Sequence, residues 1–304
     1  MTFWLILILN IIRIGVNKMK IGYIGLGLMG GPLARNLIRA GKEVKVFDLN
    51  EESIKRTLAV GTTGVGVKSA DELADCDVVF TSLPLPVHIK STMIGENGLL
   101  NKMKEGSVYI DVSTIDPQTA QELEDFAAAR GIGFMGCPLG KGPAQAEKAE
   151  QPIFAGGKKE TFEKVKEILE IVGSPVYYMG GATQAYAFKL ISNMVGMTNL
   201  AVLSEGMRLC EKAGIEGNLF QKLLAETGAD SAQLHMRGPL MLANDYANRF
   251  GVKLALKDVR LGCEMGDAWG YSAEFTKLAK SYFEKADNEG YGMEDCVAVY
   301  KVIK

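Results

Sequence analysis

The chain has few of the residues that build metal sites and disulfide frameworks. Only two of its 304 residues are histidines, His88 and His235, and only five are cysteines, none of them in a CxxC pair. These counts leave no His/Cys metal cluster, and nothing groups the two histidines with a carboxylate. An odd number of separated thiols is typical of free cysteines in a reducing compartment. We therefore expect a cytoplasmic protein without a metal site.

The sequence also lacks an excess of charge of either sign. Its formal net charge is -2, with 47% hydrophobic and 23% charged residues. This balance gives no sign of a nucleic-acid-binding surface, nor of an acidic tail for a basic partner. It is the composition of an ordinary soluble globular protein, and a length of 304 residues suits two domains better than one.

A long hydrophobic run is missing as well. The apolar stretch within residues 1–18 is interrupted by Asn10 and Arg13. It is shorter than the roughly 20 residues that a membrane span needs. No basic residue precedes it and no small-residue cleavage site follows it, so it is a poor signal peptide. We expect translation to start at Met19 and residues 1–18 to be an apolar extension that the native protein lacks. A membrane anchor is the alternative.

Strand and helix patterns alternate through the first 181 residues. Strands are expected at 20–24, 43–47, 77–83, 108–111, 132–135, 153–155 and 176–178, and helices at about 28–40, 117–130 and 161–172, with a short one after Ser69. The alternation predicts a Rossmann-type, doubly wound parallel sheet in an NAD-binding domain spanning residues 19–181. From Thr183 the pattern becomes helical, so a long inter-domain helix to Lys212 should lead into an all-helical domain over residues 182–304.

A GxGxxG turn follows the first strand and opens the first helix. It consists of Gly25, Leu26, Gly27, Leu28, Met29 and Gly30. In such turns the first glycine permits the tight bend, the second lets a pyrophosphate approach the backbone, and the third lets the helix pack on the strand. The helix N-terminus then offers free N–H groups to the phosphates. We expect all six residues to bind a dinucleotide; a tight turn without a ligand is the alternative.

Asp48 ends the second strand, 23 residues after Gly25. A carboxylate at this position can accept hydrogen bonds from both ribose hydroxyls of a dinucleotide, and it repels a 2′-phosphate. The cofactor is therefore expected to be NAD, with NADP less favoured.

The longer stretch Gly25–Leu37, GLGLMGGPLARNL, resembles the signature of the β-hydroxyacid dehydrogenase family. This family includes 3-hydroxyisobutyrate dehydrogenase and tartronate semialdehyde reductase, and it is related to 6-phosphogluconate dehydrogenase. The resemblance runs from about Lys20 to the C-terminus and says little about the substrate. It implies an oxidoreductase that interconverts a small anionic β-hydroxyacid, such as 3-hydroxyisobutyrate, and its semialdehyde. It also implies a homodimer or homotetramer formed through the helical domain.

The family's chemistry uses a lysine on the inter-domain helix, with an asparagine four residues later. The segment 180–193, GGATQAYAFKLISN, matches this pattern with Lys189 and Asn193. Positions i and i+4 share one helix face, so the ammonium and the amide can converge on one substrate oxygen. Lys189 would exchange the hydroxyl proton, and Asn193 would also bind the substrate. Desolvation is expected to lower the pKa of Lys189. A solvated surface lysine is the alternative.

Two loops match the segments that hold the substrate in the family. In the first, residues 111–117, Ser113 and Thr114 would approach the nicotinamide and the substrate; hydroxyl capping of a turn is the alternative. The second loop, residues 137–143, reads CPLGKGP where the family usually shows APVSGG.

The second loop therefore departs from the family at two positions. Gly140 replaces a serine, and Lys141 replaces a glycine before Gly142. The hydroxyl contact is lost and a positive charge is gained, which resembles a sulfolactaldehyde reductase-like branch. All three residues are expected to bind substrate. A substrate with a second anionic group is thus an alternative to 3-hydroxyisobutyrate, unless Lys141 points to solvent.

The resemblance implies further cofactor contacts outside the glycine-rich turn. Leu83 and Pro84 end the fourth strand, where the family's cofactor loop lies. Lys257, in a Lys-Asp pair beside an apolar helical stripe, is expected to bind rather than to transfer a proton, and Phe250 is expected near the nicotinamide. The alternative for Lys257 is a charged pair on a solvated edge.

One rival from another class is a non-catalytic NAD-sensing protein that kept the fold. Lys189 and Asn193 count against it, because a pure binder has no use for a proton donor. Lys189 also argues against an imine reductase, a related type in which the lysine is replaced.

Overall fold

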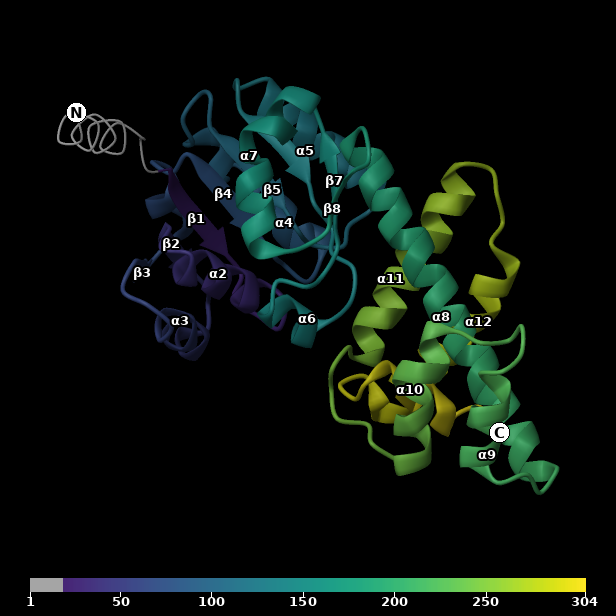
Figure 1. Ribbon diagram of the computed structural model, residues 1–304. Coiled ribbons are helices and arrows are strands. Elements are labelled where there is room, and N and C mark those ends of the chain that lie inside the picture. The colour runs from purple at the N-terminus through teal and green to yellow at the C-terminus, as the bar shows by residue number, and fades with distance from the viewer. Residues whose placement is uncertain (1–18) are drawn as a thin grey trace, which may run out of the picture.

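The computed structural model describes residues 19–304, so the predicted N-terminal extension, residues 1–18, lies outside the described part. One long helix, α8 (Ala182–Lys212), joins two lobes (Figure 1). A β-sheet flanked by helices forms the first lobe, and helices alone form the second, which contains the C-terminus.

The sheet has eight strands in the order β3-β2-β1-β4-β5-β6-β7-β8. The strands are β1 (Lys20–Ile24), β2 (Glu43–Phe47), β3 (Gly64–Gly66), β4 (Val78–Thr81), β5 (Val108–Asp111), β6 (Gly133–Gly136), β7 (Ile153–Gly157) and β8 (Val176–Tyr178). Strands β1 to β6 are parallel to one another, which confirms the Rossmann-type architecture. The chain order reverses between β1 and β4, the place where open α/β sheets bind ligands.

One strand pair departs from the predicted parallel sheet. Strand β7 runs antiparallel to β6, whereas β8 is parallel to β7. A parallel connection needs a crossover element that covers the sheet, usually a helix. The segment between β6 and β7 contains only the five-residue helix α6 (Pro143–Glu147), so the chain returns in the opposite direction.

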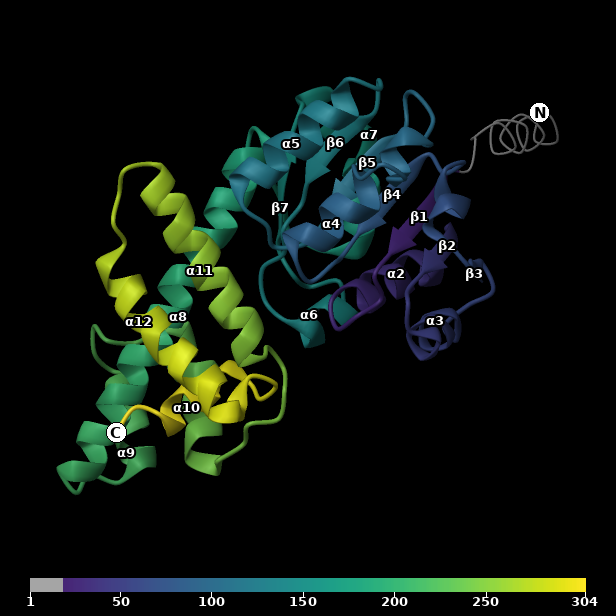
Figure 2. The same ribbon diagram turned by 180° about the vertical axis from the view of Figure 1, so that it is seen from behind.

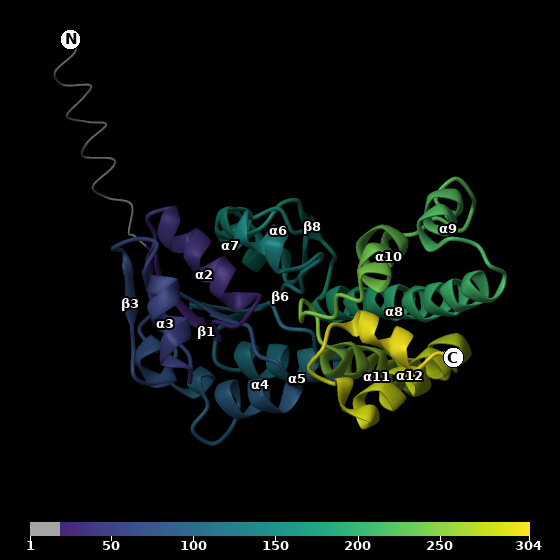
Figure 3. The ribbon, with the colours of Figure 1, turned by 90° about the horizontal axis from the view of Figure 1, so that it is seen from below.

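Helices cover both faces of the sheet. Their bounds are α2 (Gly30–Arg39), α3 (Glu51–Leu58), α4 (Pro86–Met93), α5 (Pro117–Ala128) and α7 (Lys159–Val172), with short 3₁₀ turns η1 (Ala70–Leu73) and η2 (Leu99–Asn101). Helices α2 and α7 cover one face of the sheet, and α4 and α5 cover the other (Figure 3). Asp116 starts α5 by accepting a hydrogen bond of 2.8 Å from the N–H of Thr119, and Pro117 occupies the first turn, as predicted.

The second lobe is all-helical, as predicted. Its elements are α9 (Gly217–Leu224), α10 (Ala232–Ala243), α11 (Val252–Ala268), α12 (Glu274–Ala286), a π-helical turn η3 (Asp287–Tyr291) and a 3₁₀ turn η4 (Cys296–Lys301). Helices α10, α11 and α12 pack along α8 (Figure 2). The core between them includes Met207, Phe283 and Val299, all fully or nearly fully buried.

Helix α8 belongs to both lobes. Ala182 and Tyr186 in its first turns are buried in the core of the sheet lobe, whereas Leu200 and Met207 lie in the core of the helical lobe. The stretch between these two anchored ends, which carries Lys189 and Asn193, crosses the junction of the lobes. Within residues 19–304, no helix combines the length and apolarity that crossing a membrane requires.

Candidate active site

The three glycines of the turn after β1 have different surroundings. Gly25 has a φ of +89°, and a Cβ atom there would collide with the carbonyl oxygen of Ser82. A Cβ on Gly30 would collide with the carbonyl oxygen of Gly25. By contrast, no atom lies within 4 Å of where a Cβ on Gly27 would stand. The fold itself requires the outer two glycines, while the middle one leaves open space that suits a pyrophosphate.

Asp48 lies beside this turn at the carboxyl end of β2. Its Oδ2 accepts a hydrogen bond of 2.6 Å from the N–H of Leu26, and its Oδ1 accepts one of 2.7 Å from the N–H of Asn50. These bonds fix the carboxylate while each oxygen keeps a second lone pair. Asp48 is therefore held in a position that suits the adenosine ribose. The neighbouring Leu28 side chain is exposed, and Met29 is half-buried.

Lys189 and Asn193 lie on α8 where it crosses between the lobes. Asn193 donates a hydrogen bond from Nδ2 to Oδ2 of Asp258 at 2.6 Å. The other oxygen of Asp258 lies 2.8 Å from Nζ of Lys257, which donates to the carbonyl oxygen of Thr114 at 2.7 Å. A chain of charged and polar groups thus runs from α8 through α11 to the loop after β5.

Lys257 and Asp258 are both buried, with 7% and 2% of their surface exposed. Two charges at this depth need each other and further hydrogen bonds, which Thr114 and Asn193 provide. The structure therefore excludes a solvated edge for Lys257. Asp258 was not among the residues expected from the sequence, although the Lys-Asp pair was visible there.

The ammonium of Lys189 lies beside this pair. Burial lowers the pKa of Lys189, the carboxylate of Asp258 opposes that shift, and the positive charge of Lys257 adds to it. The residue as a whole keeps partial exposure. A lysine with a lowered pKa at a partly open junction can both give and take a proton.

Ser113 and Leu83 join the carboxyl ends of β4 and β5. The Ser113 hydroxyl donates to Oδ1 of Asp111 at 2.7 Å and accepts a bond of 2.9 Å from the N–H of Leu83. Pro84 follows directly, before α4. The two predicted cofactor loops therefore contact each other at the carboxyl edge of the sheet.

The loop after β6 carries an exposed lysine in an unusual conformation. Lys141 has a φ of +58°, a region that glycine adopts freely and lysine seldom does. The N–H of Gly140 is occupied by a bond of 2.8 Å to the carbonyl oxygen of Pro152. In residues 19–304, no hydrogen bond or ion pair involves the Lys141 side chain or the N–H of Gly142. These two groups are available to an anion.

Helix α6 ties this loop to the cofactor helix α2. Glu147 forms ion pairs with Arg35 and, at 2.6 Å, with Arg39. Asn36 donates to the carbonyl oxygen of Ala146 at 2.8 Å. The Arg35 guanidinium in particular lowers the pKa of Glu147 to about 2. The loop that would bind an anion is thus held against the helix that would bind the cofactor.

Phe250 lies in the segment before α11. It packs against the core of the helical lobe, and its N–H donates to Asp295 at 3.0 Å. Its expected position near the nicotinamide stays a prediction, as do the cofactor and substrate contacts of the other site residues.

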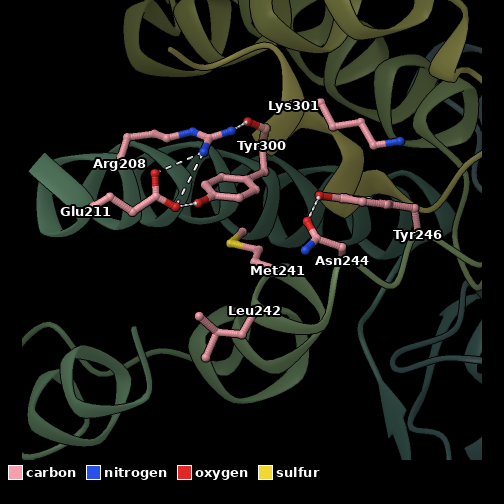
Figure 4. Close-up of a pocket in the computed structure, with 8 residues that line it drawn as sticks. All are labelled: Arg208, Glu211, Met241, Leu242, Asn244, Tyr246, Tyr300 and Lys301. Atoms are coloured by element: carbon pink, nitrogen blue, oxygen red, sulfur yellow. Dashed lines mark hydrogen bonds and ion pairs between the residues drawn. The ribbon is translucent and has the colours of Figure 1, made fainter. Parts of the chain in front are cut away.

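A cavity of about 430 Å³ lies in the helical lobe, and Lys189 is not among the residues that line it (Figure 4). Its charged lining is already paired: Arg208 lies 3.1 Å from Glu211, and Lys301 lies 2.5 Å from Glu294. Tyr300 also donates to Glu211. We therefore place the chemistry at the junction of the lobes. The part of the chain described here contains no cluster of three or more side chains able to hold a metal ion.

Comparison with known proteins covers nearly the whole chain. A family profile described as the NAD binding domain of 6-phosphogluconate dehydrogenase matches residues 20–181. Another, described as NAD-binding of NADP-dependent 3-hydroxyisobutyrate dehydrogenase, matches residues 183–303. The chain is 31% identical to 2-(hydroxymethyl)glutarate dehydrogenase of Eubacterium barkeri, over 94% of this chain and 95% of that protein.

Two further relatives carry one enzyme name. The chain is 29% identical to 3-hydroxyisobutyrate dehydrogenase of Pseudomonas aeruginosa, over 90% of this chain and 95% of the relative. The crystal structure of 3-hydroxyisobutyrate dehydrogenase from Salmonella typhimurium superimposes with a TM-score of 0.84 at 28% identity, over 93% of this chain and 99% of the other.

Proposed function

Since the chain belongs to the β-hydroxyacid dehydrogenase family, we propose that it interconverts a small anionic β-hydroxyacid and its semialdehyde, with NAD as hydride carrier and Lys189 as general acid and base. The protein is an oxidoreductase that acts on CH–OH groups with a nicotinamide cofactor. The observation that carries the proposal is Lys189, with a lowered pKa, beside the buried Asn193–Asp258–Lys257 chain.

The proposed mechanism assigns the proton to the protein. Bound nicotinamide supplies or accepts the hydride. In reduction, Nζ of Lys189 donates a proton to the carbonyl oxygen of the substrate while its positive charge stabilises the developing alkoxide. In oxidation, the neutral amine takes that proton back. Asn193, one helical turn away, is placed to orient the same oxygen, and Asp258 holds its amide at 2.6 Å.

Two neighbouring charged side chains influence the pKa of Lys189 in opposite directions. The negative charge of Asp258 favours the ammonium form of Lys189, and the positive charge of Lys257 disfavours it. Lys257 also donates a hydrogen bond to the carbonyl oxygen of Thr114, and this bond fixes the distance between helix α11 and the loop after β5. We assign Lys257 a binding and positioning role.

The preference for NAD rests on Asp48. Its carboxylate is fixed beside the glycine-rich turn, where a 2′-phosphate would meet a negative charge. The profile that matches residues 183–303 is described from an NADP-dependent enzyme, so both cofactors belong in any test.

The anionic end of the substrate is proposed to bind at the loop after β6, through the N–H of Gly142 and the backbone of Lys141. The exposed Lys141 side chain supports a second candidate, a semialdehyde with another anionic group, such as sulfolactaldehyde. A cation without an internal partner, on a backbone with positive φ, suits such a group. The name of the relative 2-(hydroxymethyl)glutarate dehydrogenase also denotes a substrate with a second carboxylate.

A turnover assay tests both candidates. Protein starting at Met19 is mixed with NAD(H) or NADP(H) and with 3-hydroxyisobutyrate, 2-(hydroxymethyl)glutarate, tartronate semialdehyde, succinic semialdehyde, threonate or sulfolactaldehyde, and reduced nicotinamide is followed by absorbance. We expect turnover with NAD(H) that is lost in Lys189→Ala and kept in Lys148→Ala, which removes an exposed lysine outside the proposed site. A loss in Lys141→Ala confined to doubly anionic substrates would favour the second candidate. Full activity of Lys189→Ala would refute the proposed proton transfer.

We also propose that the protein is a homodimer or homotetramer joined through the helical lobe. Helix α8 exposes an apolar stripe at seven-residue spacing, formed by Phe188, Val195, Val202 and Leu209. Helix α9, in the same lobe, has no buried residue. Surfaces of this kind are usually covered by another chain, and a helix stripe matches the same stripe of a second copy.

A further inference from the structure

A fully buried carboxylate lies at the end of β5, two residues before Ser113. Asp111 has no exposed surface and accepts three hydroxyl hydrogen bonds. Thr81 and Ser113 donate to Oδ1 at 2.6 Å and 2.7 Å, and Tyr186 donates to Oδ2 at 2.6 Å. No cationic side chain is among these donors. Burial raises the pKa of Asp111, and the hydroxyl bonds oppose that shift.

The donors come from three separate segments of the chain. Thr81 ends β4, Ser113 lies in the loop after β5, and Tyr186 lies on α8, 75 residues further along the chain from Asp111. Ser113 in turn accepts the N–H of Leu83 in the predicted cofactor loop. One carboxylate therefore joins the carboxyl edge of the sheet to the helix that carries Lys189.

Tyr186 precedes Lys189 by three residues, and Asn193 follows it by four. Residues at these spacings share a face of a helix. The face is tied to the sheet lobe on both sides of Lys189: through Tyr186 and Asp111 before it, and through Asn193, Asp258, Lys257 and Thr114 after it. These hydrogen bonds, together with the Lys257–Asp258 ion pair, form a ring that runs from Asp111 through α8 and α11 back to the loop of Ser113.

We infer that Asp111 and Tyr186 are positioning residues for the reaction: their hydrogen bond sets the rotation of α8 about its axis, and thereby the distance of Lys189 from the substrate oxygen. The inference rests on the proposed role of Lys189. A lysine side chain has four rotatable bonds, so a small rotation of its helix displaces the ammonium readily. Misplacing a catalytic group by about 1 Å can cost on the order of 100-fold in rate.

The structure supplies a matched control. Tyr109 is also a fully buried tyrosine, and its hydroxyl lies 2.9 Å from Thr81 in the same network. Within residues 19–304, Thr81 is the hydrogen-bond partner of that hydroxyl, which bonds neither to Asp111 nor to α8. Tyr109→Phe and Tyr186→Phe therefore remove the same atom from the same network, but only the second change breaks the bond to α8.

The test measures kcat, KM and cofactor Kd of the two variants, together with the primary isotope effect on kcat with deuterated NADH. For Tyr186→Phe we expect kcat to fall about 10- to 100-fold, with KM and Kd within about threefold of the parent. The isotope effect should rise because the chemical step becomes limiting. For Tyr109→Phe we expect kcat within about threefold, although both variants should melt at lower temperature.

Asp111→Asn in combination with Tyr186→Phe tests whether the two residues act together. The double variant should be no slower than Asp111→Asn alone, because both changes break one interaction. If Asp111→Asn does not fold, Tyr186→Phe still decides the matter. Unchanged kcat in Tyr186→Phe, or equal losses in the two tyrosine variants, would overturn the inference. Lys189→Ala in the same series separates the two proposals: if it stays active, the proton-transfer proposal fails, whereas an inactive Lys189→Ala with a fully active Tyr186→Phe overturns the positioning role alone.

Discussion

Among single residues, Lys189 has a pKa that its neighbours shift in opposite directions. Burial and the charge of Lys257 lower its pKa, while the carboxylate of Asp258 raises it. The ammonium is the form needed for reduction, and the neutral amine is the form needed for oxidation. The balance at this one side chain therefore sets the pH range in which each direction runs.

Asp258→Asn should move that range. Removal of the carboxylate that favours the ammonium lowers the pKa of Lys189 further. Reduction needs the charged form, so its rate should begin to fall with rising pH at a lower pH than in the parent. Oxidation, which needs the neutral form, should begin at lower pH. Rates measured from pH 5 to 10 in both directions check this.

The exposed Asp71, which pairs with Lys102 at the surface, provides the control variant Asp71→Asn. Its pH profile should match the parent profile. If the pH–rate profiles of Asp258→Asn match those of the parent, or shift to higher pH, Asp258 does not act on Lys189 by charge.

Local spacing made part of the site predictable. Lys189 with Asn193 was predictable from the resemblance to the family's lysine–asparagine pattern, and Gly25 with Asp48 from the GxGxxG turn and the acid that ends the next strand. Asp258 and Tyr186 could not be found that way, because their partners, Asn193 and Asp111, lie 65 and 75 residues away. Contacts of this kind depend on how α8 and α11 pack on the sheet.

At the scale of elements, the turn between β1 and α2 combines a requirement of the fold with one of the ligand. Gly25 and Gly30 are enclosed by backbone atoms, whereas Gly27 faces open space. The sequence motif alone presents the three glycines as equivalent, and the structure separates them.

Gly27→Ala should therefore weaken NAD binding with little loss of stability, whereas Gly30→Ala should lower the stability of the fold. In Gly27→Ala the added methyl group meets no protein atom within 4 Å, so the free energy of unfolding should change by less than about 1 kcal/mol. NAD affinity should fall at least about tenfold, because the methyl group occupies the predicted pyrophosphate position. Gly30→Ala should lose about 1–3 kcal/mol of stability through its collision with Gly25.

Urea unfolding and titration of NAD into each variant distinguish the two effects. Unchanged NAD affinity in Gly27→Ala, with normal stability, would place the cofactor elsewhere.

The elements that the sequence did not predict are short. Strand β3 has three residues, two of them glycine, and α6 has five residues, too few to show a period. Helix α3 did carry a signal, since Asn50 caps it by accepting the N–H of Glu52 at 3.0 Å. The long apolar strands and the 31-residue helix α8 were predictable because pattern and length agree over many residues. The division of the chain at residue 181 stays a prediction.

For the whole molecule, the exposed stripe on α8 is the feature that a single chain leaves unexplained. The exposed fraction is 56% for Val195, 62% for Val202 and 64% for Leu209. Val202→Glu should place a charge at the middle of the proposed interface and shift the protein toward monomers.

Light scattering after size-exclusion chromatography measures the mass directly. Val65→Glu is the matched control, because Val65 is 58% exposed but lies on the edge strand β3 of the sheet lobe. A parent protein that is monomeric at micromolar concentration, or a Val202→Glu variant that keeps the parent mass, would contradict the assembly proposed here.

We propose that Lys189 moves the proton while the cofactor moves the hydride. The most direct measurement is the single-turnover rate of nicotinamide reduction or oxidation in Lys189→Ala, with and without added methylamine. We expect a rate at least about 10²-fold below that of the parent, the usual size of a general acid–base contribution. We also expect methylamine to restore part of the rate in proportion to its concentration. A Lys189→Ala rate equal to that of the parent would show that another group moves the proton.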